Sequence, residues 1–369
     1  MIEQLRSLTL EQKIGQLFFI GIGGADVDTA TEQLLEEVSP GGICLFARNI
    51  REAQQTRNLL DAIRERSAIV PFLSIDQEGG LVDRLRRVQT PMPAADKIKT
   101  VDKAEELGSI VADSLKNLGF NMDFAPVVDV IDEARAGQSN GLLSREFGRS
   151  QQDVVGFAGA FLTNLQNGGI IGCLKHFPGL GASKVDSHEE LPQVLIEEDE
   201  FSNVDLFPYR ELLKRGDIHA IMAAHAAFPR LNLQEKDENG KLLPSSLSKN
   251  FISTLLRGLL GYNGLVITDD LEMGAIVRNY GIGEACKMAV NAAVDMLAIC
   301  ADADRIREGY NAVRDSVQKG EISETRIDQS LIRIAAVKSL LAKPVEFDQA
   351  AVTHLSERIT ALSENLSRS

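Results

Sequence analysis

Residues 170–194 of this chain read IIGCLKHFPGLGASKVDSHEELPQV. The first part is an almost continuous apolar run, which is typical of a strand that is covered on both faces in a parallel sheet. A loop rich in glycine and proline follows, and in it Asp186 and His188 stand two residues apart. The stretch therefore predicts a buried strand whose carboxyl end leads into a loop with titratable side chains.

Apolar runs of the same kind recur at wide spacing along the chain. They are LFFIGI from Leu17, GGICLFA from Gly41, FLSID from Phe72, MDFAPVVDV from Met122, AIMAAH from Ala220, LVITDD from Leu265 and DMLAIC from Asp295. Most of the segments between them have helical periodicity, as in 53–66, 103–118, 152–166, 248–260 and 282–293. Eight strands that alternate with helices predict an α/β protein with a single (β/α)8 TIM barrel.

A doubly wound sheet is the alternative architecture, and its phosphate-binding fingerprint fails here. Gly21 and Gly23 are followed by Asp26 where the third glycine of Gly-x-Gly-x-x-Gly belongs. We expect residues 1–345 to form the catalytic barrel and residues 346–369 to form a C-terminal helical extension packed on it. The apolar stripe of that last helix comprises Leu355, Ile359, Leu362 and Leu366.

Composition excludes several classes of partner. The chain has 369 residues, of which 44% are hydrophobic and 25% charged, and a net charge of −14. The densest basic cluster, from Arg84 to Arg87, is too short to follow a nucleic-acid backbone, so we expect no nucleic-acid partner. The N-terminus lacks the features of a signal peptide and LFFIGIGG is too short to span a membrane, so we expect a cytoplasmic protein with no membrane partner.

The four cysteines, Cys44, Cys173, Cys286 and Cys300, lie far apart in apolar stretches and show no metal-ligand spacing. We predict that they are buried free thiols. His188-Glu189-Glu190 has no second histidine at helical spacing, and the first strand carries no ligand, so neither a metal nor another cofactor is expected. A serine hydrolase is disfavoured because no Gly-x-Ser-x-Gly motif occurs.

Polar residues gather where the predicted strands end, which is the catalytic face of a TIM barrel. Six of the eight runs end this way, and this pattern favours an active site over ordinary solvation of loops. The residues at these ends are Arg48 and Asn49, Asp76 to Glu78, Asp129, Lys175 and His176, His225, and Asp269 and Asp270.

Several blocks together resemble glycoside hydrolase family 3. KHFPGLGASKVDSHEELP resembles the KHFPGHG…DSH…P signature of the family's β-N-acetylglucosaminidase branch, and SIDQEGGLVDRL resembles its DQEGGRVxRL block. GLVITDDLEMGAI is similar to the nucleophile block, and LTLEQKIGQLF, GGICLFARNI, FAPVVDV, SREFG and AAVDMLAI match in the same order. The resemblance covers the chain up to the last helix and implies the single-domain form of the family.

The resemblance also implies roles for individual residues. Asp269 would be the nucleophile, and Asp186 with His188 would form the acid/base dyad. Sugar hydroxyls would be bound by Asp76, Arg84, Arg145, Lys175 and His176. Two positions depart from the family pattern: Leu180 replaces the histidine of KHFPGHG, and Leu81 replaces the arginine of GGR.

This set of residues suits retaining glycoside cleavage, which needs a nucleophilic carboxylate and a group that donates and then removes a proton. Residues i and i+2 of an extended segment project to the same side, so Asp186 can orient His188 as a proton shuttle. Strand alternation predicts that only one of Asp269 and Asp270 faces the sugar, with Asp270 as a helix cap. Glu78 and the two glycines after it are interpreted as shaping a tight turn.

Three functional hypotheses follow. The first is an exo-β-N-acetylglucosaminidase that acts, as a monomer, on small GlcNAc-containing saccharides or muropeptides derived from peptidoglycan. The second is a β-glucosidase or a phosphorylase on the same scaffold, since a neutral histidine base would not repel phosphate. The third is a barrel that binds sugar without cleaving it, which the presence of Asp269, Asp186 and His188 disfavours.

Overall fold

The computed structural model describes residues 1–137, 141–187 and 190–368. Its centre is an eight-stranded parallel sheet with the order β10-β1-β2-β3-β6-β7-β8-β9. The strands are β1 (Phe18–Gly21), β2 (Gly42–Leu45), β3 (Phe72–Ile75), β6 (Met122–Asp123), β7 (Ile171–Phe177), β8 (Ala220–Ala223), β9 (Leu265–Thr268) and β10 (Leu297–Ile299).

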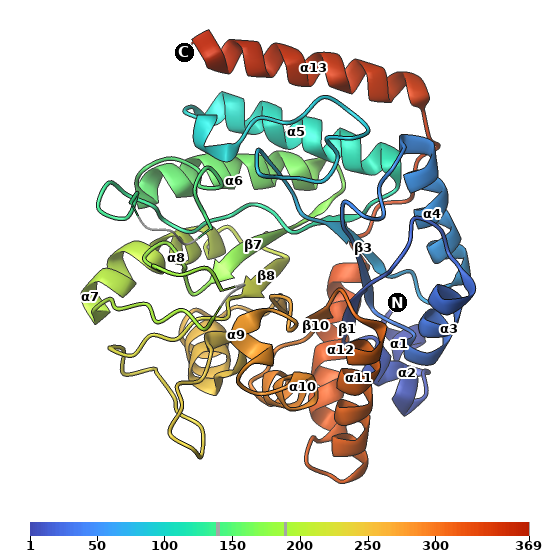
Figure 1. Cartoon of the computed structure of the whole chain (residues 1–369), viewed down its shortest axis with the longest axis vertical. Coiled ribbons are helices and arrows are strands. Elements are labelled where there is room, and N and C mark those ends of the chain that lie inside the picture. Colours follow the sequence, from blue (N-terminus) through green and yellow to red (C-terminus); the bar gives the residue numbers. More distant parts are fainter. Residues whose placement is uncertain (138–140, 188–189, 369) are drawn as a thin grey trace.

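The two ends of the sheet meet and close it into a barrel. Ile267 of β9 forms a parallel bridge with Met296, which directly precedes β10, and the N–H of Thr268 donates to the carbonyl of Met296 at 3.0 Å. Every strand of the barrel coincides with one of the predicted apolar runs, and Figure 1 shows the helices around it. The predicted (β/α)8 fold is therefore confirmed.

Helices cover the barrel wall. They are α3 (Thr29–Val38), α4 (Ala53–Arg66), α5 (Val101–Leu118), α6 (Gln151–Asn167), α8 (Phe207–Leu213), α10 (Ile282–Asn291), α11 (Ala303–Gln318) and the π-helix η4 (Asn250–Leu259). Shorter segments are α1 (Ile2–Arg6), α2 (Leu10–Gly15), η1 (Ala95–Lys97), α7 (Glu198–Glu200), η2 (Phe201–Asp205), η3 (Ser245–Leu247) and α9 (Gly274–Val277), and α12 (Glu324–Lys338) packs against α1 and α2.

The last helix, α13 (Gln349–Arg368), lies across α5 and also contacts α4 (Figure 1). Three residues of its apolar stripe are buried, Leu355, Ile359 and Leu362, and Leu366 packs against the core. Among the described residues, no helix combines the length and the apolar character that crossing a bilayer requires.

Two local predictions from the sequence were wrong. The run from Met122 is a regular strand only as far as Asp123, because Pro126 has no N–H to continue the ladder. Val127 nevertheless bridges to Lys175 of β7. A two-stranded antiparallel sheet, β4 (Gln77–Gly79) and β5 (Val82–Asp83), follows β3 where only a turn was expected.

Aromatic side chains fill the barrel interior and support the site above them. The Phe19 ring lies 5.0 Å from Phe124 and 6.3 Å from Phe72, measured between centroids. All three rings are at most 3% exposed. Because Phe124 also lines the cavity described next, this packed layer forms part of the cavity floor.

Candidate active site

A cavity of about 390 Å³ opens at the carboxyl ends of the barrel strands. Residues from many strand ends line it, as expected for the catalytic face of this fold. Seven of the predicted site residues do so: Asp76, Arg84, Arg145, Lys175, His176, Asp186 and Asp269. The eighth, His188, lies outside the described residues.

Three charged side chains that line the cavity, Asp76, Arg145 and Lys175, form a group with the buried Glu78 that is here called the cavity cluster. The Lys175 ammonium is 2.7 Å from the Asp76 carboxylate and 2.5 Å from that of Glu78. Arg145 donates two hydrogen bonds to Glu78, at 2.7 and 2.9 Å. Two cations and two anions thus alternate, so the cluster carries no net charge.

Mutual attraction keeps Lys175 and Glu78 charged although both are buried. Burial would lower the pKa of Lys175, but Asp76 and Glu78 outweigh it and raise that pKa. Burial would likewise raise the pKa of Glu78, and the charges of Lys175 and Arg145 instead hold it well below its usual range. Asp76 has a side chain 19% exposed and faces the cavity, so its carboxylate is placed to accept from sugar hydroxyls.

His176 is fixed by a buried carboxylate. Its Nδ1 lies 2.7 Å from Asp129 Oδ2, while Nε2 is 3.5 Å from the guanidinium of Arg145. The other oxygen of Asp129 accepts from the N–H of Leu180 at 2.6 Å, which ties the following loop to the same carboxylate. The peptide bond between Lys175 and His176 is cis, and both side chains line the cavity.

Asp269 follows directly after β9 and is held by the backbone. Its N–H donates to the carbonyl of Ala223 at 3.0 Å, and its Oδ1 accepts from the N–H of Asp270 at 2.9 Å. The first bond ties the backbone of Asp269 to β8, and the second fixes its carboxylate against the segment that follows β9. A rigidly placed carboxylate on the cavity wall has the geometry required of a nucleophile.

The prediction that Asp270 faces away from the cavity was wrong, because Asp270 lines it together with Asp269. The regular strand ends at Thr268, so side-chain alternation no longer applies two residues later. Asp270 Oδ1 accepts from the N–H of Glu272 at 3.0 Å. Burial, with the nearby charges of Glu272 and Asp269, raises the pKa of Asp270 to about 7.

The loop that follows β7 places Asp186 on the cavity wall. Its carboxylate lies against Gly141, where an added Cβ would be only 2.6 Å from Oδ2. Gly141 has a φ of 73°, so the position favours glycine for two independent reasons. The carbonyl of Ser187 accepts from the N–H of Ala275, which links this loop to α9.

Arg84 and Leu180 complete the predicted wall. The guanidinium of Arg84 is 5.9 Å from the centroid of the Phe46 ring, and its buried Nε has no hydrogen-bond partner among the described residues. Leu180 is 6% exposed and lines the cavity, so this departure from the family pattern bears on the site. Leu81 is 70% exposed at the β4–β5 turn and does not line the cavity.

Three polar residues at strand ends serve the scaffold instead. Arg48 donates to the carbonyls of Ile22 and Cys300, and Asn49 donates to that of Ile22 at 3.0 Å. His225 bonds to Ser246 Oγ at 2.7 Å and to the carbonyl of Asp270 at 3.1 Å. His225 therefore supports the segment that carries Asp270.

Glu78 is the residue whose role the sequence interpretation missed. The two glycines after it do adopt positive φ values of 87° and 56°, as a tight turn requires. Glu78 itself is 6% exposed and bonds to both cations of the cavity cluster. An acidic residue beside an expected sugar-binding Asp76 was the signal that could have indicated this role.

Within the part of the chain that the structure describes, no three His, Cys, Asp or Glu side chains are placed to share a metal ion. The expectation of a metal-free and cofactor-free site stays a prediction. All four cysteines are buried free thiols, as predicted.

Comparison with known proteins identifies the family. The family model described as the glycosyl hydrolase family 3 N terminal domain matches residues 9–337. The chain belongs to glycoside hydrolase family 3. It is a glycoside hydrolase, which agrees with the resemblance noted in the sequence.

Curated relatives of this family 3 hydrolase are named β-hexosaminidase. One from Tolumonas auensis is 31% identical over 304 residues, covering 81% of this chain and 86% of the relative. One from Pseudomonas aeruginosa is 34% identical over 293 residues, covering 77% and 82%. A family 3 β-N-acetylglucosaminidase from Paenibacillus superposes with a TM-score of 0.86 at 34% identity, covering 97% of this chain and 69% of that one.

Proposed function

We propose that this hydrolase is a retaining exo-β-N-acetylglucosaminidase that removes a terminal β-linked GlcNAc from small saccharides. The observation that carries this proposal is the joint placement of Asp269, Asp186 and the cavity cluster around one cavity at the catalytic face. The names of the curated relatives support the choice of sugar. We further propose cytoplasmic muropeptide fragments of peptidoglycan as the natural substrates.

In this proposal Asp269 attacks the anomeric carbon and forms a covalent glycosyl ester, while the leaving oxygen takes a proton. The hydrogen bond from the Asp270 N–H to Asp269 Oδ1 fixes the orientation of the attacking carboxylate. Asp76, Arg84, Arg145, Lys175 and His176 hold the sugar hydroxyls. Because the cavity cluster is already ionised and paired, it needs little rearrangement when the sugar binds.

The proton donor and later base would be His188, oriented by Asp186. An unperturbed imidazole has a pKa of about 6.5, so it can both donate and accept a proton near neutrality. A carboxylate two residues away favours the imidazolium and selects the tautomer. The position of Asp186 on the cavity wall supports this assignment.

A substrate panel tests the specificity. Nitrophenyl β-glycosides of GlcNAc and of glucose are compared with and without inorganic phosphate, and the proposal expects nitrophenol release from the GlcNAc substrate that is independent of phosphate. Faster release from the glucose substrate would indicate a β-glucosidase. A requirement for phosphate would indicate a phosphorylase, and the absence of any release would indicate a protein that binds sugar without cleaving it. The same assay with EDTA tests the metal-free prediction, which expects unchanged rates.

Leaving groups of graded pKa test the dyad. A dinitrophenyl leaving group needs little protonation, so His188→Ala should retain more activity toward it than toward a sugar aglycone. Asp186→Asn should act in the same direction but less strongly. If His188→Ala shows the same leaving-group dependence as the wild type, His188 is not the general acid.

A further inference from the structure

Two of the four cysteines meet on the wall of the active-site cavity. Cys44 is the next-to-last residue of β2 and Cys300 follows β10, and both line the cavity. They are 1% and 3% exposed, so their thiols reach open space only through that cavity. Nothing in the proposed reaction uses either thiol.

The topology explains why they are close. β1 lies between β10 and β2, and Gly21 of β1 is in register with Cys44. Gly21 also packs on Cys300, since a Cβ added to it would be 1.9 Å from the Cys300 carbonyl oxygen. No side chain stands on the strand between them, so the two thiols lie at the same level of the barrel and on the same cavity wall.

The backbone positions argue against a direct disulfide. Neighbouring strands lie about 4.8 Å apart, so residues on the two strands that flank β1 have Cα atoms roughly 9 Å apart. A disulfide spans Cα separations of about 4.4 to 6.8 Å. The neighbouring Cys44 thiol and burial also raise the pKa of Cys300, which keeps its thiol protonated and slows thiolate chemistry. A single atom that bonds to both sulfurs can bridge this longer Cα separation, which a direct sulfur–sulfur bond cannot.

We propose that Cys44 and Cys300 form a paired-thiol site that binds trivalent arsenic compounds and thereby blocks the active-site cavity. With phenylarsine oxide, two arsenic–sulfur bonds form, and the arsenic–oxygen bond and two sulfur–hydrogen bonds break. The two hydrogens and the oxygen leave as one water, and no atom changes its oxidation state. The bound phenylarsenic group then occupies the space beside Asp76 and Asp270, which line the same cavity.

The other two cysteines provide matched controls. Cys173 on β7 and Cys286 on α10 are fully buried, and burial raises the pKa of both thiols. Neither belongs to the cavity wall formed by the described residues. Substituting them should leave the response to the arsenical unchanged.

Intact-mass measurement and activity are followed together after treatment with phenylarsine oxide. The wild type, Cys173→Ala and Cys286→Ala should each bind one phenylarsenic group, mapped to a cross-link between the Cys44 and Cys300 peptides. They should lose nearly all activity on nitrophenyl β-GlcNAc and recover it with dimercaptopropanol. Cys44→Ala and Cys300→Ala, checked for an unchanged melting temperature, should resist, and free GlcNAc should slow the reaction of the wild type.

Adducts that map to Cys173 or Cys286, full sensitivity of Cys44→Ala, or no adduct on the wild type would each overturn the proposal. If Cys300→Ala does not fold, Cys44→Ala alone decides the question. Formation of a Cys44–Cys300 disulfide with diamide would contradict the strand geometry given above. The mass measurement does not depend on the proposed function, so absence of activity on GlcNAc substrates would leave the test of the thiol pair intact.

Discussion

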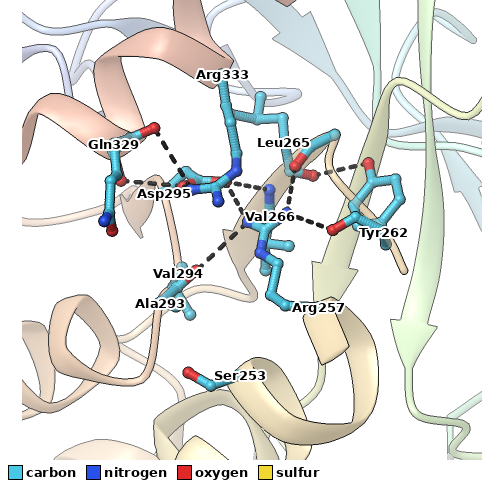
Figure 2. A network of polar contacts seen from close by, with 12 residues as sticks. Ser253, Arg257, Tyr262, Leu265, Val266, Ala293, Val294, Asp295, Gln329 and Arg333 are labelled. Carbon is cyan, nitrogen blue, oxygen red and sulfur yellow. Dashed lines mark hydrogen bonds and ion pairs between the residues drawn. The ribbon is translucent and has the colours of Figure 1, made fainter. Parts of the chain in front are cut away.

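Two buried charge networks in this barrel look alike in composition but differ in balance. The cavity cluster pairs Lys175 and Arg145 with two carboxylates, and the pKa of both cations is raised despite burial. The second network, shown in Figure 2, surrounds Asp295. There the guanidiniums of Arg257, Arg326 and Arg333 share one fully buried carboxylate.

In the Asp295 network burial prevails, and the pKa values of Arg257 and Arg326 are lowered because one carboxylate compensates them only in part. Backbone carbonyls supply the remaining acceptors, for example those of Tyr262 and Gly264 for Arg257. Asp295 precedes β10, and its partners come from η4 and α12, so this network joins helices to the barrel. The comparison teaches that buried ion pairs do not identify an active site unless they also face a cavity.

The largest effect should follow from removing the charge of Asp295. Asp295→Asn leaves buried guanidiniums without a carboxylate, which we expect to cost about 3–5 kcal/mol of unfolding free energy. The specific activity of the folded fraction should stay unchanged. Chemical denaturation measures the loss, with Asp328→Asn, the half-exposed partner of Lys13, as a control expected to cost less than about 1 kcal/mol. Equal costs would show that the Asp295 network is not the structural one.

The converse effect is expected at Lys175. Lys175→Met should lower kcat/KM by roughly 100-fold or more, because a preorganised cation of the cavity is removed. Its stability cost should be smaller than that of Asp295→Asn, since Asp76 faces the cavity and can be hydrated. Lys338→Met is the matched control, because Lys338 is a buried lysine on α12 whose ammonium bonds to Gln16 instead of a carboxylate. Comparable activity losses in Lys175→Met and Lys338→Met would show that a buried lysine matters for activity whether or not it faces the cavity.

A smaller, pH-dependent effect is expected at Asp270. Its pKa is raised from 3.8 to about 7 in the folded protein, so between these values the folded state binds more protons than the unfolded state. The contribution of Asp270 to the free energy of unfolding is therefore fully present at low pH, and it is lost as the pH rises toward 7. Relative to Asp270→Asn, the wild type should lose at most about 4 kcal/mol between pH 4 and 8, because one pKa unit corresponds to about 1.4 kcal/mol, and solvent screening at this half-buried carboxylate reduces the loss. Melting temperatures of both proteins across this range measure the difference, and parallel curves would contradict the assignment.

The barrel was predictable because its eight strands are almost continuous apolar runs. Such runs are typical of strands that are covered on both faces, as in a parallel barrel. The short β4–β5 sheet was not, since residues 77–83 read QEGGLVD, with two adjacent glycines and no alternation of apolar and polar residues. The truncation of β6 depends on the position of a single proline. Local patterns therefore gave the architecture, and the deviations from it lie at the site.

Most of the cavity residues were likewise predictable from strand ends and family motifs, but their partners were not. Arg48 and His225 occupy the same kind of position as Lys175, yet they bond to the backbone or to Ser246 and do not line the cavity. The role of Glu78 depends on Arg145, which is 67 residues away in the sequence. Such long-range pairing leaves no trace in local spacing.

The central claim is that Asp269, and not its neighbour Asp270, forms the covalent intermediate at this cavity. The direct measurement traps the wild-type enzyme with a 5-fluoro glycosyl fluoride of GlcNAc and identifies the labelled peptide by mass spectrometry. The account predicts one sugar per chain on Asp269, and no label and no turnover in Asp269→Ala. A label on Asp270, or full turnover by Asp269→Ala, would contradict it.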